Sequence, residues 1–166
     1  MSAFTQVGSG ELIVGATARV GHDSNIFGNN SEIDDSFFSI VPELRFVKDD
    51  SRSTINARIA TDITRYGDQS DEDFENFYSS IDISLPTGQG SPLSGDIHFG
   101  FDSIKDTNLL INDRLNSDTF SGSANLTYNI SSKTGLRGGF QYSDSQNELF
   151  SDTKTSLVTA GVQYNY

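Results

Sequence analysis

The chain has 166 residues, a formal net charge of −12 and 34% hydrophobic residues, with no cysteine and no tryptophan. The lack of cysteine excludes disulfides and thiolate metal sites, and the scarcity of Lys and Arg argues against a nucleic-acid partner, because affinity for phosphates depends on those side chains. No apolar run approaches the roughly 20 residues of a membrane-spanning helix, and the first residues lack the zones of a signal peptide.

Apolar and polar residues alternate with a period of two along the chain, which predicts β-strands. Between residues 36 and 47, for example, Phe38, Ile40 and Leu44 share one face, and Ser39 and Glu43 share the other. No stretch has a helical period. In chain order, the eight alternating stretches cover residues 14–20, 36–47, 53–66, 77–85, 93–102, 120–130, 136–142 and 158–166.

The links between these stretches alternate in length. Long links at 21–35, 67–75, 104–117 and 145–154 are interleaved with short ones at 48–52, 87–92 and 131–134. Alternate links of an up-and-down barrel lie at opposite rims, and bacterial membrane barrels have short periplasmic turns and long outer loops. The sequence therefore predicts an all-β, antiparallel, up-and-down transmembrane β-barrel of about eight strands. Residues 11–166 would form the barrel, and residues 1–10 an N-terminal periplasmic segment.

The long links are acidic. They contain 13 of the 23 acidic residues, whereas their basic residues are Lys105, Arg114 and Lys154. Residues 67–75 hold the densest run, for which we expect weak binding of divalent cations that bridge the loop to anionic lipopolysaccharide. The alternative is simple solvation. The carboxylates of this run are Asp68, Asp71, Glu72, Asp73 and Glu75.

The alternation alone does not tell which face points inward, because a soluble barrel or sandwich shows the same period. Three observations favour lipid on the apolar face. Its mid-strand positions carry no charge, aromatic residues such as Phe46 and Phe101 fall near strand ends, as in interfacial girdles, and the polar face carries nearly balanced charge. Charges in a narrow lumen must be paired, because an unpaired buried charge costs several kcal/mol.

We therefore predict a lumen charge network on the polar face. His98 is assigned to this network rather than to catalysis, because no serine motif provides a nucleophile beside it. The predicted members are Arg19, Glu43, Arg45, Arg58, Asp62, Asp82, Asp96, His98, Asp102 and Arg137.

The final residues carry a resemblance. Thr159, Gly161, Tyr164 and Tyr166 form a pattern of a polar residue, a glycine and two aromatic residues that is similar to the C-terminal β-signal of bacterial outer-membrane proteins. In that family, the barrel-assembly machinery reads the signal. With eight strands and four long loops, the whole chain also resembles the small barrels of the OmpA and OmpX type.

A second resemblance points to a wider barrel. Residues 23–27, with the sequence DSNIF, and the following Asp34 and Asp35 are similar to the start of β-barrel porins that are encoded with exopolysaccharide genes. Those barrels have roughly twice as many strands. On this resemblance, the chain would be the N-terminal half of a longer porin.

The expected function is that of a non-enzymatic protein of the bacterial outer membrane, a structural anchor that displays surface loops around a plugged or narrow polar lumen. An eight-stranded barrel has room inside only for side chains. The expected partners are outer-membrane lipid, lipopolysaccharide and the assembly machinery, without a cofactor. The alternatives are a porin-type barrel for polysaccharide export or solute passage, and a soluble β-barrel ligand carrier.

Overall fold

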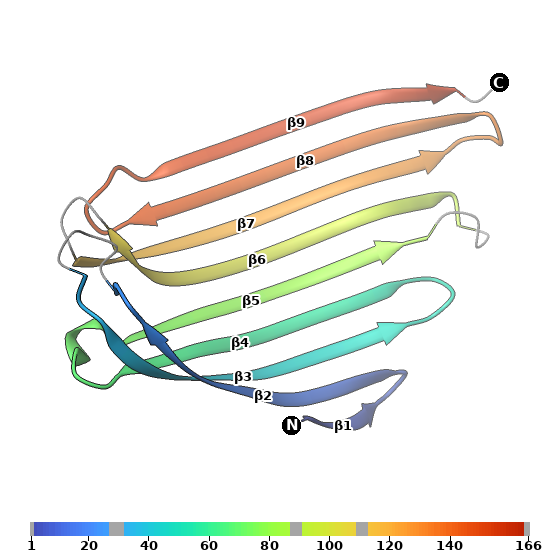
Figure 1. Ribbon diagram of the computed structural model, residues 1–166. Helices are drawn as coiled ribbons and strands as arrows, with labels where there is room; N and C mark the ends of the chain where they lie inside the picture. Colours follow the sequence, from blue (N-terminus) through green and yellow to red (C-terminus); the bar gives the residue numbers. More distant parts are fainter. Residues whose placement is uncertain (1, 27–31, 87–90, 109–112, 165–166) are drawn as a thin grey trace.

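The computed structural model describes residues 2–26, 32–86, 91–108 and 113–164. These residues form one antiparallel sheet of nine strands in which each strand pairs with the next along the chain (Figure 1). The all-β, up-and-down prediction is confirmed. The strands are β1 (Ser2–Val7), β2 (Gly10–Asp23), β3 (Asp35–Asp49), β4 (Thr54–Tyr66), β5 (Phe74–Leu85), β6 (Leu93–Asn108), β7 (Asp113–Asn129), β8 (Thr134–Asn147) and β9 (Thr153–Tyr164), with a short 3-10 helix η1 (Ser70–Glu72) before β5.

The described sheet has one strand more than the eight predicted. The eight alternating stretches correspond to β2 to β9, and the additional strand β1 lies within the segment 1–10. It pairs with β2 from Ser2 opposite Gly15 to Val7 opposite Gly10. Gly8 has a φ of 63° in the turn between the two strands, a conformation that glycine adopts without steric cost.

The links after β2, β4, β6 and β8 lie at one end of the sheet and the other links at the opposite end (Figure 1). The predicted long link 104–117 is largely strand, because β6 extends to Asn108 and β7 begins at Asp113. The link after β8 is also shorter than predicted, since β9 begins at Thr153. The sequence therefore assigned to loops several residues that form extensions of the strands.

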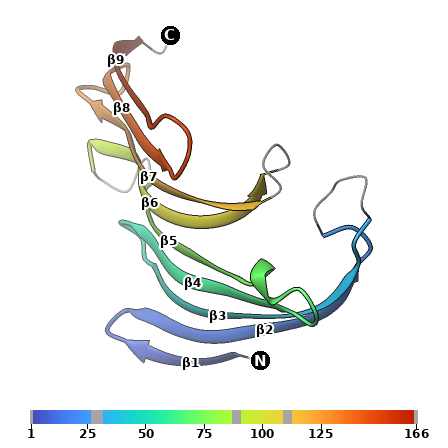
Figure 2. The same ribbon diagram turned by 90° about the vertical axis from the view of Figure 1, so that its left-hand side faces the viewer.

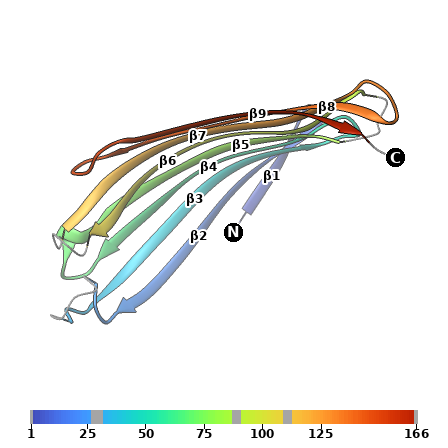
Figure 3. The ribbon, with the colours of Figure 1, turned by 90° about the horizontal axis from the view of Figure 1, so that it is seen from above.

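The described sheet is not closed into a barrel. β1 pairs only with β2, and β9 pairs only with β8, so the sheet has two free edges. It is curved along its length and across its strands (Figures 2 and 3). Alternation specifies strands and their faces, whereas closure depends on strand tilt, stagger and number. The predicted closure therefore does not follow from the alternation on which it was based.

One face of the sheet is apolar and exposed. Ile59 and Phe99 lie near the middle of their strands, yet each is 49% exposed. Among the described residues, only Ile26 and Ala60 are buried hydrophobic residues. The accessible surface is 10825 Å², whereas a compact soluble protein of this mass exposes about 8,100 Å². The described chain thus has no conventional hydrophobic core, and its apolar side chains lie uncovered on one face.

The opposite, polar face is concave. Arg114 of β7 donates a hydrogen bond to Glu72 of η1. Arg114 also contacts Tyr66 and Phe74, which belong to the polar face by register. η1 lies on the inner side of the curved sheet (Figure 2). Buried polar residues of this face include Ser39, Thr64 and Asn76. Curvature therefore crowds the polar side chains together and spreads the apolar ones apart.

The apolar face forms a band across the sheet. Within β3 it extends from Phe38 to Phe46, and the register continues it through Ile59 and Ile81 to Phe99. In most strands the band is about nine residues long, which matches the roughly 9 to 11 tilted residues that cross a bilayer. Ring pairs lie near its long-link boundary, namely Phe77 with Phe101 at 6.1 Å and Phe120 with Tyr142 at 6.2 Å.

Charged residues of the apolar face lie at the boundaries of this band. Lys48 lies at the short-turn end of β3. Lys154 of β9 and Asp144 of β8 form a 2.8 Å ion pair beyond Tyr142. The charged residues at the long-link boundary include Arg65, Glu75, Asp118, Asp144 and Lys154.

Within the ranges that the structure describes, no helix is long and apolar enough to cross a membrane. The only helix in those ranges is the single turn η1, in the link between β4 and β5. The strands therefore provide the extended elements of the described fold.

The turn between β3 and β4 is held by Asp50. Its carboxylate lies 2.7 Å from Lys48 Nζ and accepts hydrogen bonds from the backbone N–H groups of Arg52 and Ser53. Mainly through the Lys48 hydrogen bond, the pKa of Asp50 falls to about 2. Because this pKa is below the ordinary value, the turn is stabilised above about pH 4 and loses that contribution as the pH falls through about 2.

We expect a carbon-13 titration of the Asp50 carboxyl group in detergent micelles to show a midpoint near pH 2. The Asp50→Asn variant should lack the corresponding acid-dependent change in the amide signals of Arg52 and Ser53. A midpoint near pH 4, the ordinary value for an aspartate, would show that these contacts do not form.

Candidate functional site

The structure places all ten residues of the predicted charge network on the concave polar face. In the strand register, Arg19 is opposite Ser39, Arg45 is opposite Arg58, and Asp82 is opposite His98. Residues opposite each other in an antiparallel pair share a face of the sheet. We call this polar face the concave face below. The network members lie on β2, β3, β4, β5, β6 and β8.

Glu43 is the centre of the first cluster. Its Oε2 accepts a 2.7 Å hydrogen bond from Arg58 Nε, and its Oε1 lies 3.3 Å from Arg45 Nη2. Both guanidiniums are partly exposed, at 44% for the Arg45 side chain and 41% for Arg58. One carboxylate therefore bridges two arginines that remain accessible from the concave side.

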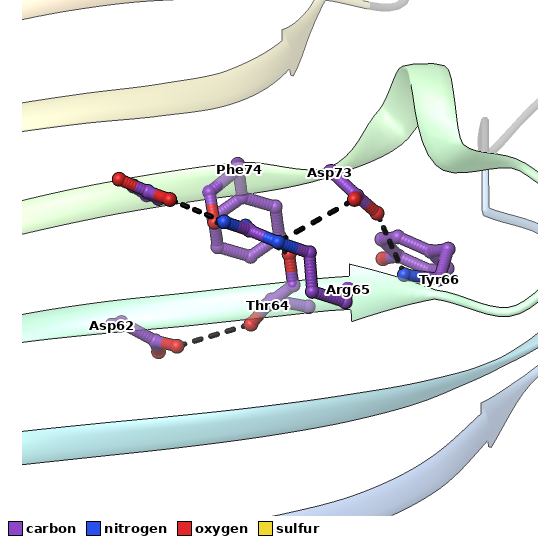
Figure 4. A network of polar contacts seen from close by, with 7 residues as sticks. Asp62, Thr64, Arg65, Tyr66, Asp73 and Phe74 are labelled. Atoms are coloured by element: carbon purple, nitrogen blue, oxygen red, sulfur yellow. Dashed lines mark hydrogen bonds and ion pairs between the residues drawn. The ribbon is translucent and has the colours of Figure 1, made fainter.

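Asp62 belongs to a hydrogen-bonded group near the long-link end. Its Oδ1 accepts a 2.8 Å hydrogen bond from Ser39 Oγ and a 3.0 Å hydrogen bond from Thr64 Oγ1. Figure 4 shows the Thr64 contact beside the ion pairs of Arg65. Ser39 and Thr64 are buried, so this carboxylate ties β3 to β4 with hydroxyl donors instead of a cation.

A second cluster joins β5, β6 and β7. His98 Nδ1 lies 2.7 Å from Asp82 Oδ1, and its Nε2 lies 3.5 Å from Ser121 Oγ. Gly100 provides the space, because a Cβ at this position would lie 2.8 Å from Ser121 Oγ. Ser121 was missed by the sequence analysis, since its proximity depends on register. The Asp82 carboxylate orients the His98 imidazole. A site for acyl transfer would need, in addition, preorganised hydrogen-bond donors that stabilise the oxyanion.

The remaining network members are less connected. Asp96 accepts a 2.8 Å hydrogen bond from Ser84 Oγ. Among the described residues, Arg19, Asp102 and Arg137 form no ion pair. The structure thus brings part of the predicted network together, as separate clusters on one face.

The acidic run is engaged mainly with arginines. Arg65 pairs with Glu75 and lies 3.5 Å from Asp73, whose Oδ1 also accepts a hydrogen bond from the Tyr66 N–H (Figure 4). Within the described ranges, no group of three or more acidic, His or Cys residues could hold a metal ion. The carboxylates of Asp68 and Asp71 are exposed. Cation binding by the loop stays a prediction, for which these two carboxylates are the best placed.

Arg114 is a rim residue that the sequence analysis placed in a loop. Its Nε donates a 2.9 Å hydrogen bond to Glu72 Oε2, and both side chains are less than one-tenth exposed. The guanidinium carbon lies 4.5 Å from the Phe74 ring centroid and 5.7 Å from that of Tyr66. This cation and its aromatic neighbours fasten the end of the β6–β7 hairpin to η1. The sequence signal for this contact was a basic residue, Arg114, in a link that neighbours the acidic run in the loop pattern.

Asp35 orders the same rim. It is 5% exposed, and its carboxylate accepts hydrogen bonds from the backbone N–H groups of Ser36, Asp68 and Gln69. The start of β3 is thereby joined to the link after β4. The neighbouring DSNIF stretch begins at the end of β2, and its Phe27 lies outside the described residues.

The residues of the predicted β-signal lie on the edge strand β9. Thr159 is opposite Gly139 and shares the concave face, whereas Tyr164 is opposite Thr134 on the apolar face and is 55% exposed. A Cβ at Gly139 would lie 2.3 Å from Thr159 Oγ1, so the glycine admits this threonine. Gly161 shares the face of Thr159. Tyr166 lies outside the described residues.

Comparisons of the chain with protein-family models, with curated proteins and with solved structures found no match. The features of the described chain that bear on function are the exposed apolar band, the charged concave face and the free sheet edges.

Proposed function

We propose that the chain is an outer-membrane β-barrel protein whose nine-stranded sheet forms part of the wall of a porin-type barrel. The apolar band would contact outer-membrane lipid, and the concave face would line an aqueous lumen through which polar solutes pass. The observation that carries this proposal is the segregation of the two faces. Side chains such as Ile59 and Phe99 lie uncovered on the convex face, while charged and hydroxyl side chains fill the concave one.

The dimensions of the sheet support lipid contact. The band of about nine residues suits the thickness of a bilayer, and aromatic pairs such as Phe77 with Phe101 lie near one boundary. Lipopolysaccharide would surround the acidic rim, and the barrel-assembly machinery would read Thr159, Gly161 and the terminal aromatic residues. A bacterial outer-membrane location follows from this proposal.

The open edges favour a lumen wider than that of an eight-stranded barrel. Nine strands are described, and β1 and β9 are still not paired with each other. Further strands that pair with these edges would complete a larger barrel, whose interior is too wide for side chains alone to fill. Solute passage is therefore favoured over the plugged anchor that the sequence predicts.

The plugged structural anchor with displayed loops is the second candidate. It is favoured by the Arg114–Glu72 contact, which holds the β6–β7 hairpin against η1 on the concave side. A soluble carrier with an apolar interior is less favoured, because the apolar residues occupy the convex face.

Planar-bilayer recordings on the detergent-purified chain distinguish these candidates. The proposal predicts stable step conductances larger than those of an eight-stranded barrel, together with heat-dependent mobility on detergent gels. Membrane insertion and heat-dependent mobility without conductance would instead support the anchor. A monodisperse protein that needs no detergent and does not enter vesicles would contradict membrane insertion and support the carrier.

A further inference from the structure

The β3–β4 pair contains an unfavourable juxtaposition on the concave face. Arg45 and Arg58 are directly opposite each other in the register, and like charges at such positions destabilise a sheet. Glu43 lies between them and contacts both guanidiniums. A local arrangement that opposes folding, with only one carboxylate to offset it, is typical of a functional site.

A third arginine lines a hollow beside this pair. Arg19 of β2 lines a hollow of about 400 Å³ together with Arg45, Arg58 and Glu43. Arg19 is exposed, and it forms no ion pair with the described residues. Three arginines therefore line one hollow on the concave face, and in the described part of the chain its single carboxylate, Glu43, pairs with two of them. We call these three arginines and Glu43 the arginine cluster.

The positive charge of the arginine cluster contrasts with the rest of the protein. The chain carries a formal net charge of −12, and the neighbouring strands β5 and β6 place Asp82, Asp96 and Asp102 on the same concave face. Asp62 of β4 also lies on this face, so the positive charge is local to the arginine cluster and does not extend over β2 to β4. Solubility does not require such a local concentration of positive charge, whereas an anionic solute would be attracted by it.

We propose that the arginine cluster binds a carboxylate group of a solute. Glu43 shows how these arginines hold a carboxylate. Its two oxygens lie 2.7 Å from Arg58 Nε and 3.3 Å from Arg45 Nη2. Each guanidinium has five N–H donors, so most donors remain for a second carboxylate in the hollow, which Arg19 also lines. Guanidinium forks match carboxylates in shape as well as in charge.

This site rests on the proposed function in one respect, because a solute would reach it through the lumen. Binding can nevertheless be measured in a protein that does not conduct ions. Citrate is a suitable probe because it carries three carboxylates. We expect calorimetric titration of the full chain in detergent, at matched ionic strength, to detect citrate binding that weakens by about tenfold or more in Arg58→Gln, since a charge-assisted hydrogen bond contributes roughly that factor. Arg137→Gln, on the same face of β8, is the matched control and should leave binding unchanged.

Glu43→Gln provides a second variant with the opposite expectation. It keeps all three arginines and frees both guanidiniums from the internal carboxylate, so citrate should bind several-fold more tightly. Asp102→Asn removes one negative charge from the same face without touching the cluster and should have a smaller effect. Heat-dependent gel mobility checks that each variant folds.

The outcomes separate this site from the proposed pore. Absence of citrate binding in the unaltered protein, or equal weakening by Arg137→Gln and Arg58→Gln, would overturn the carboxylate site even if the protein conducts ions. Citrate binding with the expected variant pattern in a protein that shows no conductance would leave the site standing and contradict the pore.

Discussion

Replacement of Ala124 by arginine is expected to destabilise the membrane-inserted protein by about 2 to 4 kcal/mol, the cost of a basic side chain at mid-depth on the lipid face of a barrel. Ala124 lies in the middle of the apolar band, between Ile97 of β6 and Phe140 of β8. Since alanine is small, the substitution removes little packing, and the effect reports on the surroundings of the convex face. Urea unfolding in lipid vesicles, followed by gel mobility, measures it.

Ser123→Arg is the matched control. Ser123 is the neighbouring residue on the concave face, opposite His98 and near Asp82. An aqueous, partly acidic lumen should tolerate the new arginine with a change of less than about 1 kcal/mol. If Ser123→Arg proved more destabilising than Ala124→Arg, the assignment of the two faces would be reversed.

Replacement of Arg114 by methionine is the second change with a large expected effect. It leaves the carboxylate of Glu72 without its guanidinium, in a place where the Glu72 side chain is only 9% exposed. Breaking a buried ion pair by removing one partner costs about 3 to 5 kcal/mol. We expect this cost to appear as local opening of the contact between η1 and the β6–β7 hairpin, seen as faster hydrogen exchange in both elements.

The double variant Arg114→Met with Glu72→Met tests the cause. Without a buried charge left behind, much of the lost protection should return, because apolar replacement of both partners is often nearly neutral. Equal exchange rates in the single and double variants would mean that the cation–aromatic contacts with Phe74 and Tyr66, and not the ion pair, hold the rim together.

Much of the fold was predictable from local alternation. Phe38, Ile40 and Leu44 share one face in the structure because successive side chains of any strand point to opposite sides. The strand β1 was missed because its apolar residues do not lie on a single face. Ala3 is opposite Val14 on the apolar face, whereas Phe4 lies on the polar face, so the sequence of β1 shows no clear alternation. Strand extensions beyond the apolar band were missed for a similar reason, since β6 and β7 continue there with polar residues.

The site was predictable as a face but not as a set of contacts. Every predicted network residue lies on the concave face, because face depends only on position along each strand. The opposition of Arg45 to Arg58 depends on register, and the approach of Arg114 to Glu72 joins residues 42 positions apart. Closure of the sheet depends on tilt and stagger, which no local pattern specifies.

Accessibility scanning of β5 tests most directly whether the convex face contacts lipid and the concave face contacts water. The sequence has no cysteine, so single cysteines at residues 77–85 can each carry a nitroxide label in vesicles. We expect a two-residue period in which labels at Ile81 and Ile83 collide with oxygen dissolved in the bilayer, while labels at Ser80 and Asp82 collide with a water-soluble nickel chelate. A uniform response along β5, or the same period with the two faces exchanged, would contradict a transmembrane wall with a polar lumen.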